Sequence, residues 1–214
     1  MPTKQPLIHV LHPGLFTTVQ DLGRSGYQRF GVSVSGAMDP WALMVGNRLL
    51  GNPDQAAGLE ITLQGPQLLF EQAVRIAITG ADLSPTSNGL ALPMWTVVAM
   101  PAGSRLQFGM RRQGARAYLT VAGGITGPMI LGSLSTHVRS GLGGLAGRAV
   151  KKWDQLFVGT ASRAAAQPIG RSLPERYRPR YTGSPAVRVM PGPQSDYFTD
   201  DAIRLLTSSP YRVT

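Results

Sequence analysis

The chain has 214 residues, of which 43% are hydrophobic, and this is enough for one or two small domains with a buried core. It contains no cysteine, which excludes disulfides, thiol catalysis and zinc–thiolate sites. The formal net charge is +10, and the arginines are spread along the chain rather than gathered on one helix. As the explanation for this charge we rank the nucleotide composition of the genome first, attraction to anionic substrates or an acidic partner second, and nucleic-acid binding third.

The start of the chain has no apolar core of a signal peptide, and no run approaches the length of a membrane span, so we expect a cytoplasmic protein. Short strand-like runs dominate the rest of the chain. Glycine (26) and proline (17) are frequent enough to place tight turns between them, which predicts a mainly β fold, a barrel or a sandwich. The predicted strands are residues 7–11, 67–70, 74–79, 95–99, 105–108, 117–121 and 155–158.

The run 74–79 shows the clearest strand pattern, because its residues alternate between two faces. Val74, Ile76 and Ile78 fall on one face, and Arg75 falls on the other. This alternation predicts a strand with one face in the core.

One helix is predicted by its end signals. Asp39 suits the N-cap, Pro40 suits the first helical position, and Gly51 follows the last turn. The body, residues 41–50, carries an apolar stripe that we expect to face the core. The stripe consists of Trp41, Met44, Val45 and Leu49, with Leu50 at its margin and Asn47 and Arg48 outside it.

The C-terminal part differs in composition. Residues 161–185 carry prolines and arginines without an apolar period, which predicts a linker with a domain boundary near residue 180. Beyond it, Thr199 caps a predicted helix from Asp200 to about Leu206. Residues 186–214 are too few to bury a core of their own, so we expect exposed apolar surface there.

A glycine-flanked turn places a carboxylate and a guanidinium group close together in the sequence. Asp21 and Arg24 are three residues apart, with Gly23 between them and Gly26 after them. Glycine permits positive φ and close backbone approach, so the turn can hold both side chains in one geometry. Two interpretations are open: a structural turn stapled by its own ion pair, or a functional pair. We predict that both side chains lie at a concave surface rather than in a closed core.

Three further carboxylates occupy motif-like positions. Asp39 is explained by its helix cap, and Glu60, in a strand-like run, is interpreted as a structural carboxylate that needs an arginine partner. Asp82 follows Gly80 at a strand end, where functional side chains are common, so we assign it a functional role. The three histidines have no metal-ligand spacing, and we expect no protein-ligated metal.

A glycine-rich run ends at Arg148 and contains Gly143 and Gly144. It lacks the Gly-Lys-Ser/Thr ending of a P-loop, which excludes a Walker-type site. Its amides can still bind an anion or oxyanion, or the glycines can simply form tight turns. The hydroxyls just upstream fit substrate binding or turn capping, and they belong to Ser133, Ser135 and Thr136.

An ordered series of motifs runs through the chain, at residues 17–27, 31–39, 47–52, 59–66, 79–82, 116–125, 131–136, 143–148 and 188–193. From about residue 7 to the end, this series closely resembles the family of the 5-oxoprolinase C subunit. That family is also called allophanate hydrolase subunit 2, KipI antagonist, or the A/B half of a biotin-dependent carboxyltransferase domain.

The resemblance implies a cyclophilin-like β-barrel subdomain with a few short helices over residues 1–180 and the incomplete beginning of a second β subdomain over 181–214. Two motifs of the family's later part do not occur here. The resemblance therefore also implies a C-terminally truncated chain, inactive alone, whose active site forms at the junction with a partner subunit.

The implied function is ATP-dependent opening of 5-oxoproline to glutamate, together with a KipI-like B subunit and an A subunit, with ATP bound with the partner. One alternative is the carboxyltransferase half of urea carboxylase, with biotin on another polypeptide. Another is a non-catalytic regulator that binds a KipI-like kinase inhibitor. The expected catalytic residues are Asp21, Arg24 and Asp82, and the expected substrate- or anion-binding residues are Gly123, Gly124, Ser133, Ser135, Thr136, Gly143, Gly144 and Arg148.

Overall fold

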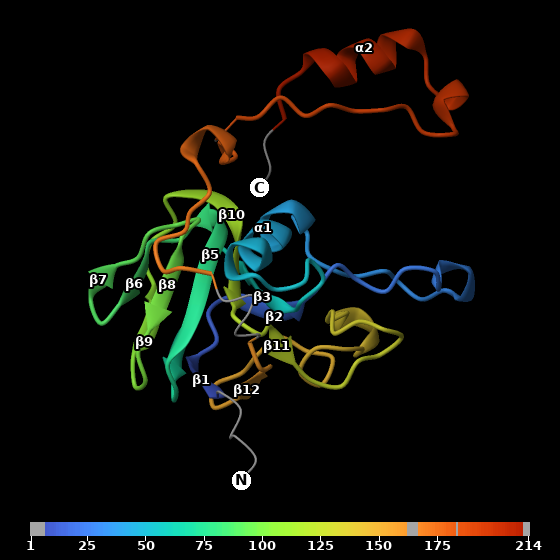
Figure 1. The fold of residues 1–214 in the computed structure, drawn as a ribbon. Coiled ribbons are helices and arrows are strands. Elements are labelled where there is room, and N and C mark those ends of the chain that lie inside the picture. The colour runs from blue at the N-terminus through green and yellow to red at the C-terminus, as the bar shows by residue number, and fades with distance from the viewer. Residues whose placement is uncertain (1–6, 162–166, 183, 212–214) are drawn as a thin grey trace. The chain divides into compact units, whose positions relative to one another are not determined.

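The structure is a computed structural model that describes residues 7–161, 167–182 and 184–211. It divides into two compact units, Met1–Gly183 and Ser184–Thr214, which we call unit 1 and unit 2. Within its described residues, unit 1 contains two antiparallel sheets and one α-helix (Figure 1). The predicted mainly β fold is confirmed.

The first sheet has seven strands in the described residues and the second has five. In spatial order the first sheet consists of β11 (Ile125–Thr126), β12 (Gln155–Val158), β1 (Leu7–His12), β4 (Gln67–Phe70), β9 (Arg105–Phe108), β6 (Pro85–Ser87) and β7 (Leu90–Ala91). The second consists of β2 (Phe16–Gln20), β3 (Gly58–Thr62), β10 (Gln113–Val121), β5 (Val74–Asp82) and β8 (Val97–Met100). Each of the seven predicted runs contributes to a strand.

Both sheets contribute to one hydrophobic core. Ile8 and Val10 enter it from β1, and Ile76 and Ile78 enter it from β5. Each such side chain stabilises the fold by about 1.5–3 kcal/mol when fully buried. The alternation predicted for residues 74–79 is confirmed, because the intervening Ala77 packs in a separate cluster with residues of the helix.

Helix α1 (Pro40–Leu50) begins and ends where its signals predict. The Asp39 side chain accepts a hydrogen bond from the Ala42 N–H at 3.0 Å, and Gly51 adopts a φ of 76° at the C-cap. The helix packs closely on β5 and β10. At Gly46, a Cβ would lie 2.7 Å from the Thr120 hydroxyl, so only glycine permits this approach.

The predicted apolar stripe of α1 is wrong in part. Trp41 is 39% exposed, whereas Asn47 is fully buried. The reason is polar: the Asn47 amide donates to the carbonyls of Asp54 and Ala56, and its oxygen accepts from Asn52. A buried amide with these partners holds the loop after the helix, which an apolar count does not detect.

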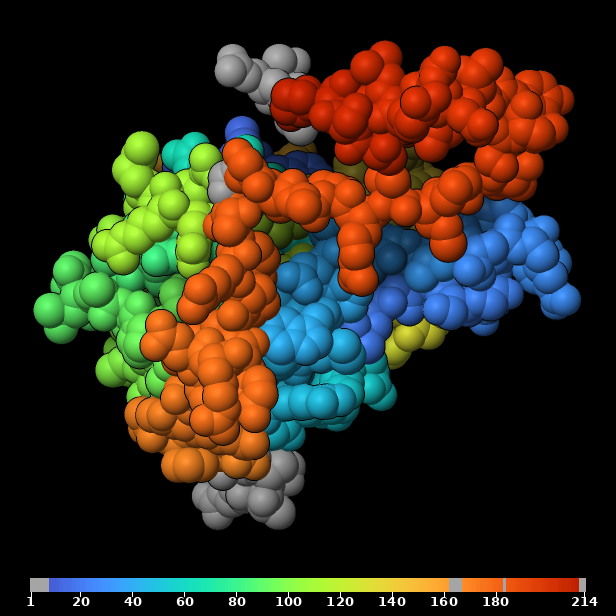
Figure 2. Space-filling model, turned by 90° about the horizontal axis from the view of Figure 1, so that it is seen from above, coloured from blue at the N-terminus to red at the C-terminus, as the bar shows by residue number. Residues whose placement is uncertain are grey.

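The predicted linker is also wrong for much of its length. Residues 168–181, which we call the strap, lie along unit 1 beside β8. The Val97 N–H donates to the carbonyl of Arg171, and the Leu173 N–H donates to the carbonyl of Trp95. Figure 2 shows the strap, in orange, crossing between the green strands and the light-blue helix. Residues 162–166, also part of the predicted linker, lie outside the described residues.

Unit 2 contains helix α2 (Asp200–Ser208), capped by the Thr199 hydroxyl as predicted. Its exposed apolar side chains match the expectation for residues 186–214 and are Val187, Val189, Met190, Tyr197, Phe198, Leu205, Leu206 and Tyr211. The assignment of unit 2 as the beginning of a second subdomain stays a prediction. Over the described ranges, no helix is both long and apolar enough to cross a membrane.

Candidate functional site

Two adjoining cavities open where β5 ends. The larger, about 340 Å³, is bounded by the strap and by residues 80–113 of unit 1, and the smaller is about 180 Å³. Asp82 and Met94 line both, so we treat them as one cleft, the Asp82 cleft. The larger cavity is lined by Glu175, Arg178, Pro179 and Arg180 from the strap and, from earlier in unit 1, by Gly80, Asp82, Met94, Trp95 and Gln113.

An irregularity in the second sheet opens the cleft. Asp82 pairs with Gln113, but the register shifts before the next pair, Gly80 with Ala117. Gly114 adopts a φ of 73° within the shifted segment. Such bulges re-aim side chains and are frequent beside active sites.

Two non-glycine residues beside the cleft have left-handed backbone conformations. Ser84 has a φ of 51° and lines the smaller cavity, and Trp95 has a φ of 59° and lines the larger one. Such conformations cost about 1–3 kcal/mol each and cluster at functional sites. Six further non-glycine residues in the described part of the chain, none of them lining either cavity, also have positive φ, so these two conformations do not by themselves single out the cleft.

The Asp82 carboxylate keeps the capacity to accept hydrogen bonds. One oxygen accepts from the Ser84 N–H at 2.8 Å, and the other lies 3.6 Å from Nη1 of Arg112. The side chain is 22% exposed, so a ligand can reach it. A carboxylate in this position can accept a proton or an N–H from a bound molecule.

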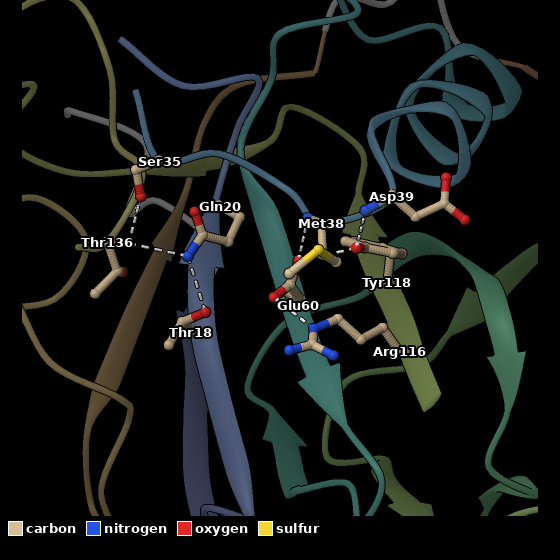
Figure 3. A network of polar contacts seen from close by, with 9 residues as sticks. All are labelled: Thr18, Gln20, Ser35, Met38, Asp39, Glu60, Arg116, Tyr118 and Thr136. Atoms are coloured by element: carbon tan, nitrogen blue, oxygen red, sulfur yellow. Dashed lines mark hydrogen bonds and ion pairs between the residues drawn. The ribbon is translucent and has the colours of Figure 1, made fainter. Parts of the chain in front are cut away.

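A buried polar network lies behind the cleft. The Tyr118 hydroxyl donates to Glu60 at 2.8 Å and accepts from the Asp39 N–H at 2.7 Å (Figure 3). Glu60 also accepts from the Met38 N–H and, at 3.2 Å, from Nε of Arg116. The network fixes the segment that leads into α1, and the structural interpretation of Glu60, with its arginine partner, is confirmed.

The network reaches both the cleft and the strap. A Cβ on Gly80 would lie 3.2 Å from the Tyr118 ring, so the phenol packs directly behind the cleft wall. From the strap, the Tyr181 hydroxyl donates to the Asp39 carboxylate at 3.1 Å. Burial raises the pKa of both phenols well above the ordinary value, and the neighbouring carboxylates raise it further, so both hydroxyls remain donors.

The structure places Asp21 inside the fold, at 6% exposure, rather than at a concave surface. Its carboxylate accepts hydrogen bonds from the Gly23 N–H, the Leu134 N–H and the hydroxyls of Ser133 and Ser135. Four donors occupy this carboxylate, so it joins the end of β2 to the 133–136 loop. The prediction of a surface position is wrong.

Arg24 is 1% exposed, and within the described residues no ion pair joins it to Asp21. Its Nη2 donates to the carbonyl of Ser135, and its Nε lies 3.4 Å from the carbonyl of Ile130. Nη1 is buried without a partner. The ion pair that belonged to the structural interpretation of this turn is therefore absent, and backbone carbonyls hold the guanidinium instead.

The hydroxyl loop and the glycine-rich run pack against each other. Ser133, Ser135 and Thr136 are almost completely buried, at 0–3% exposure. A Cβ on Gly143 would lie 2.1 Å from the carbonyl oxygen of Ser135, and one on Gly144 would lie 1.9 Å from the Thr136 hydroxyl. The Gly144 N–H already donates to the carbonyl of Leu134. Of the two open interpretations, these contacts favour tight turns over an anion cradle.

The remaining predicted anion ligands also have internal partners. The Gly123 N–H donates to the side chain of Asn52, and the Gly124 N–H donates to the carbonyl of Val121. Arg148 forms a bidentate ion pair with Asp154 at 2.6 and 2.9 Å. This guanidinium holds the pKa of the Asp154 carboxyl below its usual value. Of the predicted site residues, only Asp82 lines the cleft.

The sequence profile of the carboxyltransferase domain, subdomain A and B, matches residues 30–214, which is most of the chain. The chain belongs to the carboxyltransferase domain family. It is 35% identical over 210 residues to the C subunit of 5-oxoprolinase from Escherichia coli, covering 97% of this chain and 65% of that protein. It is 34% identical over 212 residues to urea amidolyase of Saccharomyces cerevisiae, covering 96% of this chain and 12% of that protein.

Solved structures of the carboxyltransferase domain family agree with this assignment. The chain matches the crystal structure of the K. lactis urea amidolyase with a TM-score of 0.77 and 37% identity, over 85% of this chain and 11% of that one. It matches the protein TTHA0988 with a TM-score of 0.84 and 32% identity, over 98% of this chain and 40% of that one. The resemblance inferred from the motifs is confirmed, and the chain spans less than two thirds of each of these relatives.

Sequence reasoning missed the strap side of the cleft of this carboxyltransferase domain. It placed Arg178 and Arg180 in a linker, although four arginines against the single Glu175 between residues 171 and 180 mark this stretch as strongly basic. In the described part of the chain, no three His, Asp or Glu side chains gather as a metal site. The larger cavity presents the Asp82 carboxylate together with the guanidinium groups of Arg178 and Arg180.

Proposed function

We propose that this chain acts as part of a 5-oxoprolinase C subunit, in an enzyme that opens 5-oxoproline to glutamate at the expense of ATP. The supporting observation is the 35% identity to the Escherichia coli C subunit over 97% of this chain, with a further 37% identity over 150 residues to the Haemophilus influenzae C subunit. The name of these relatives designates one subunit of several, so partner subunits belong to the proposal.

In this proposal a KipI-like B subunit and an A subunit complete the enzyme, which works in the cytoplasm. The chain has no P-loop, so ATP is bound with the partner. The balanced reaction takes 5-oxoproline, ATP and water to glutamate, ADP and phosphate. Asp82 is the residue of this chain that meets the reacting molecule, because it combines exposure with free acceptor capacity.

The second candidate is the carboxyltransferase half of a urea carboxylase. It is favoured by 36% identity over 213 residues to a putative urea carboxylase of Emericella nidulans and by a TM-score of 0.77 to the Kluyveromyces lactis urea carboxylase. In that reaction, biotin carried on another polypeptide delivers a carboxyl group to urea. The carboxyl group transferred in that reaction is itself an anion, so the arginines that border the cleft do not rank the two candidates. Urea carboxylase stands second because the match covers 17% of that relative, against 65% of the Escherichia coli C subunit.

The deciding experiment assembles the protein with its B and A subunits and measures ADP release with 5-oxoproline or with urea and biotin. We expect 5-oxoproline-dependent ADP release, and a loss of roughly 100-fold or more in Asp82→Asn, since a positioned acid or base contributes about 10²–10⁴. Asp54→Asn is the matched control, because that carboxylate pairs with Arg48 outside the cleft. The proposal would be contradicted if ADP release did not depend on 5-oxoproline, or if it occurred with urea and biotin but not with 5-oxoproline.

A further inference from the structure

The strap supplies the Asp82 cleft with two guanidinium groups that form no ion pair within the described residues. They belong to Arg178 and Arg180, which line the larger cavity. Nε of Arg178 donates to the carbonyl of Leu173 at 2.9 Å, which orients its guanidinium and leaves the other N–H groups available. Two guanidinium groups at one cavity wall form a site for a planar oxyanion.

The opposite charges in the same wall limit which anion can bind. Asp82 and Glu175 also line this cavity. They repel a doubly charged phosphate, whereas their oxygens can accept N–H groups from a ligand that carries one negative charge. The volume of about 340 Å³ lies near the lower limit of small-molecule sites, about 300–1,000 Å³. Met94, Trp95 and Pro179 add an apolar side to the wall.

We infer that Arg178 and Arg180 bind the carboxylate of a small acid that carries an N–H group and a compact apolar body. Asp82 and Glu175 accept the N–H, and the apolar body lies against Met94 and Trp95. 5-Oxoproline has these three parts. The strap is then the element that selects a carboxylate-bearing substrate. The inference rests on the proposed function for the identity of the acid, and its test separates the two.

The test measures binding of 5-oxoproline by calorimetry, with the protein alone and with its partner subunits. The comparison ligands are 2-pyrrolidinone, which keeps the ring and lacks the carboxylate, and inorganic phosphate. We expect 5-oxoproline to bind at least about tenfold more tightly than either, because a charge-assisted pair with arginine is lost in the first and repulsion opposes the second.

Substitutions then locate the site. Arg180→Gln is expected to weaken 5-oxoproline binding about tenfold or more, and Arg180→Lys to restore part of it. The matched control is Arg171→Gln, which removes the same charge from the same strap at a position that does not line the cavity. Far-UV circular dichroism and the unfolding midpoint of each variant show whether the fold is intact.

Several results would overturn the inference: equal affinity for 5-oxoproline and 2-pyrrolidinone, tighter binding of phosphate, equal weakening by Arg171→Gln, or no binding with or without the partner subunits. The proposed function is judged separately. If Arg180→Gln weakens binding but the assembled enzyme does not turn over 5-oxoproline, the site stands and the proposed reaction is wrong. If the enzyme turns over 5-oxoproline and Arg180→Gln keeps the KM, the carboxylate binds elsewhere.

Discussion

Replacing Asp21 by asparagine decides between a structural and a catalytic role for this residue. Asparagine keeps the shape of the side chain and one acceptor oxygen. In place of the other oxygen it presents an NH₂ group, which cannot accept the N–H of Leu134 that now lies 2.6 Å from the carboxylate. At least one hydrogen bond to a charged group is therefore lost, and a buried N–H is left unpaired.

The expected cost follows from these contacts. A hydrogen bond to a charged group contributes about 1.5–3 kcal/mol, and an unpaired buried donor costs about 1–3 kcal/mol. These terms overlap, so we expect Asp21→Asn to lower the free energy of unfolding by about 2–3 kcal/mol. With an m-value of about 2–3 kcal/mol/M, the urea midpoint falls by about 1 M.

The assay is equilibrium unfolding in urea, followed by circular dichroism and tryptophan fluorescence. Asp54→Asn is the control, since its exposed carboxylate has only a surface partner and its loss should shift the midpoint much less. An Asp21→Asn protein with the midpoint of the wild type and with abolished turnover would refute the structural argument and restore the catalytic assignment.

Two further predictions concern stability. The Arg148 guanidinium lowers the pKa of Asp154, so the pair stabilises the fold fully above the unfolded pKa of about 3.9, and this contribution is lost as the pH falls through the folded pKa. In unfolding curves recorded from pH 6 to pH 3, the stability deficit of Asp154→Asn relative to the wild type should therefore shrink below about pH 4. Gly144→Ala should lower the stability in thermal unfolding by about 1–3 kcal/mol more than Gly89→Ala, because both glycines have positive φ but only at Gly144 would a Cβ press against Thr136. Equal effects of the two substitutions would show that the loop relaxes without cost and would contradict the prediction.

The features that the sequence predicted are those set by local chemistry. The α1 ends follow from Asp39 and Gly51, the α2 start follows from Thr199, and the alternation of Ile76 and Ile78 follows from the two-residue strand period. Each of these signals acts between residues a few positions apart. The sequence signals for strands β2 and β3 are weaker, because these strands mix buried threonines and Glu60 among apolar residues.

The candidate site was predicted only where a local signal existed. Asp82 was found because it ends a strand after Gly80. Asp21 was misplaced because its hydroxyl donors, Ser133 and Ser135, are 112 and 114 residues away in sequence, and no local pattern reports such a contact. The strap is held by backbone hydrogen bonds to Trp95 and Val97. Because backbone hydrogen bonds leave no side-chain pattern, the sequence predicts a linker there.

The pairing of β1 has a consequence for how the protein is made. Both neighbours of β1 come later in the chain: β4 pairs along one edge, and β12 pairs along the other, with His9 opposite Gln155. At a synthesis rate of about 5–20 residues per second, the second edge waits roughly 7–30 s for its partner to leave the ribosome. During that interval the nascent chain exposes an unpaired strand edge beside apolar residues, and such an edge favours aggregation. Slower translation between β4 and β12 should therefore lower the soluble yield of this protein.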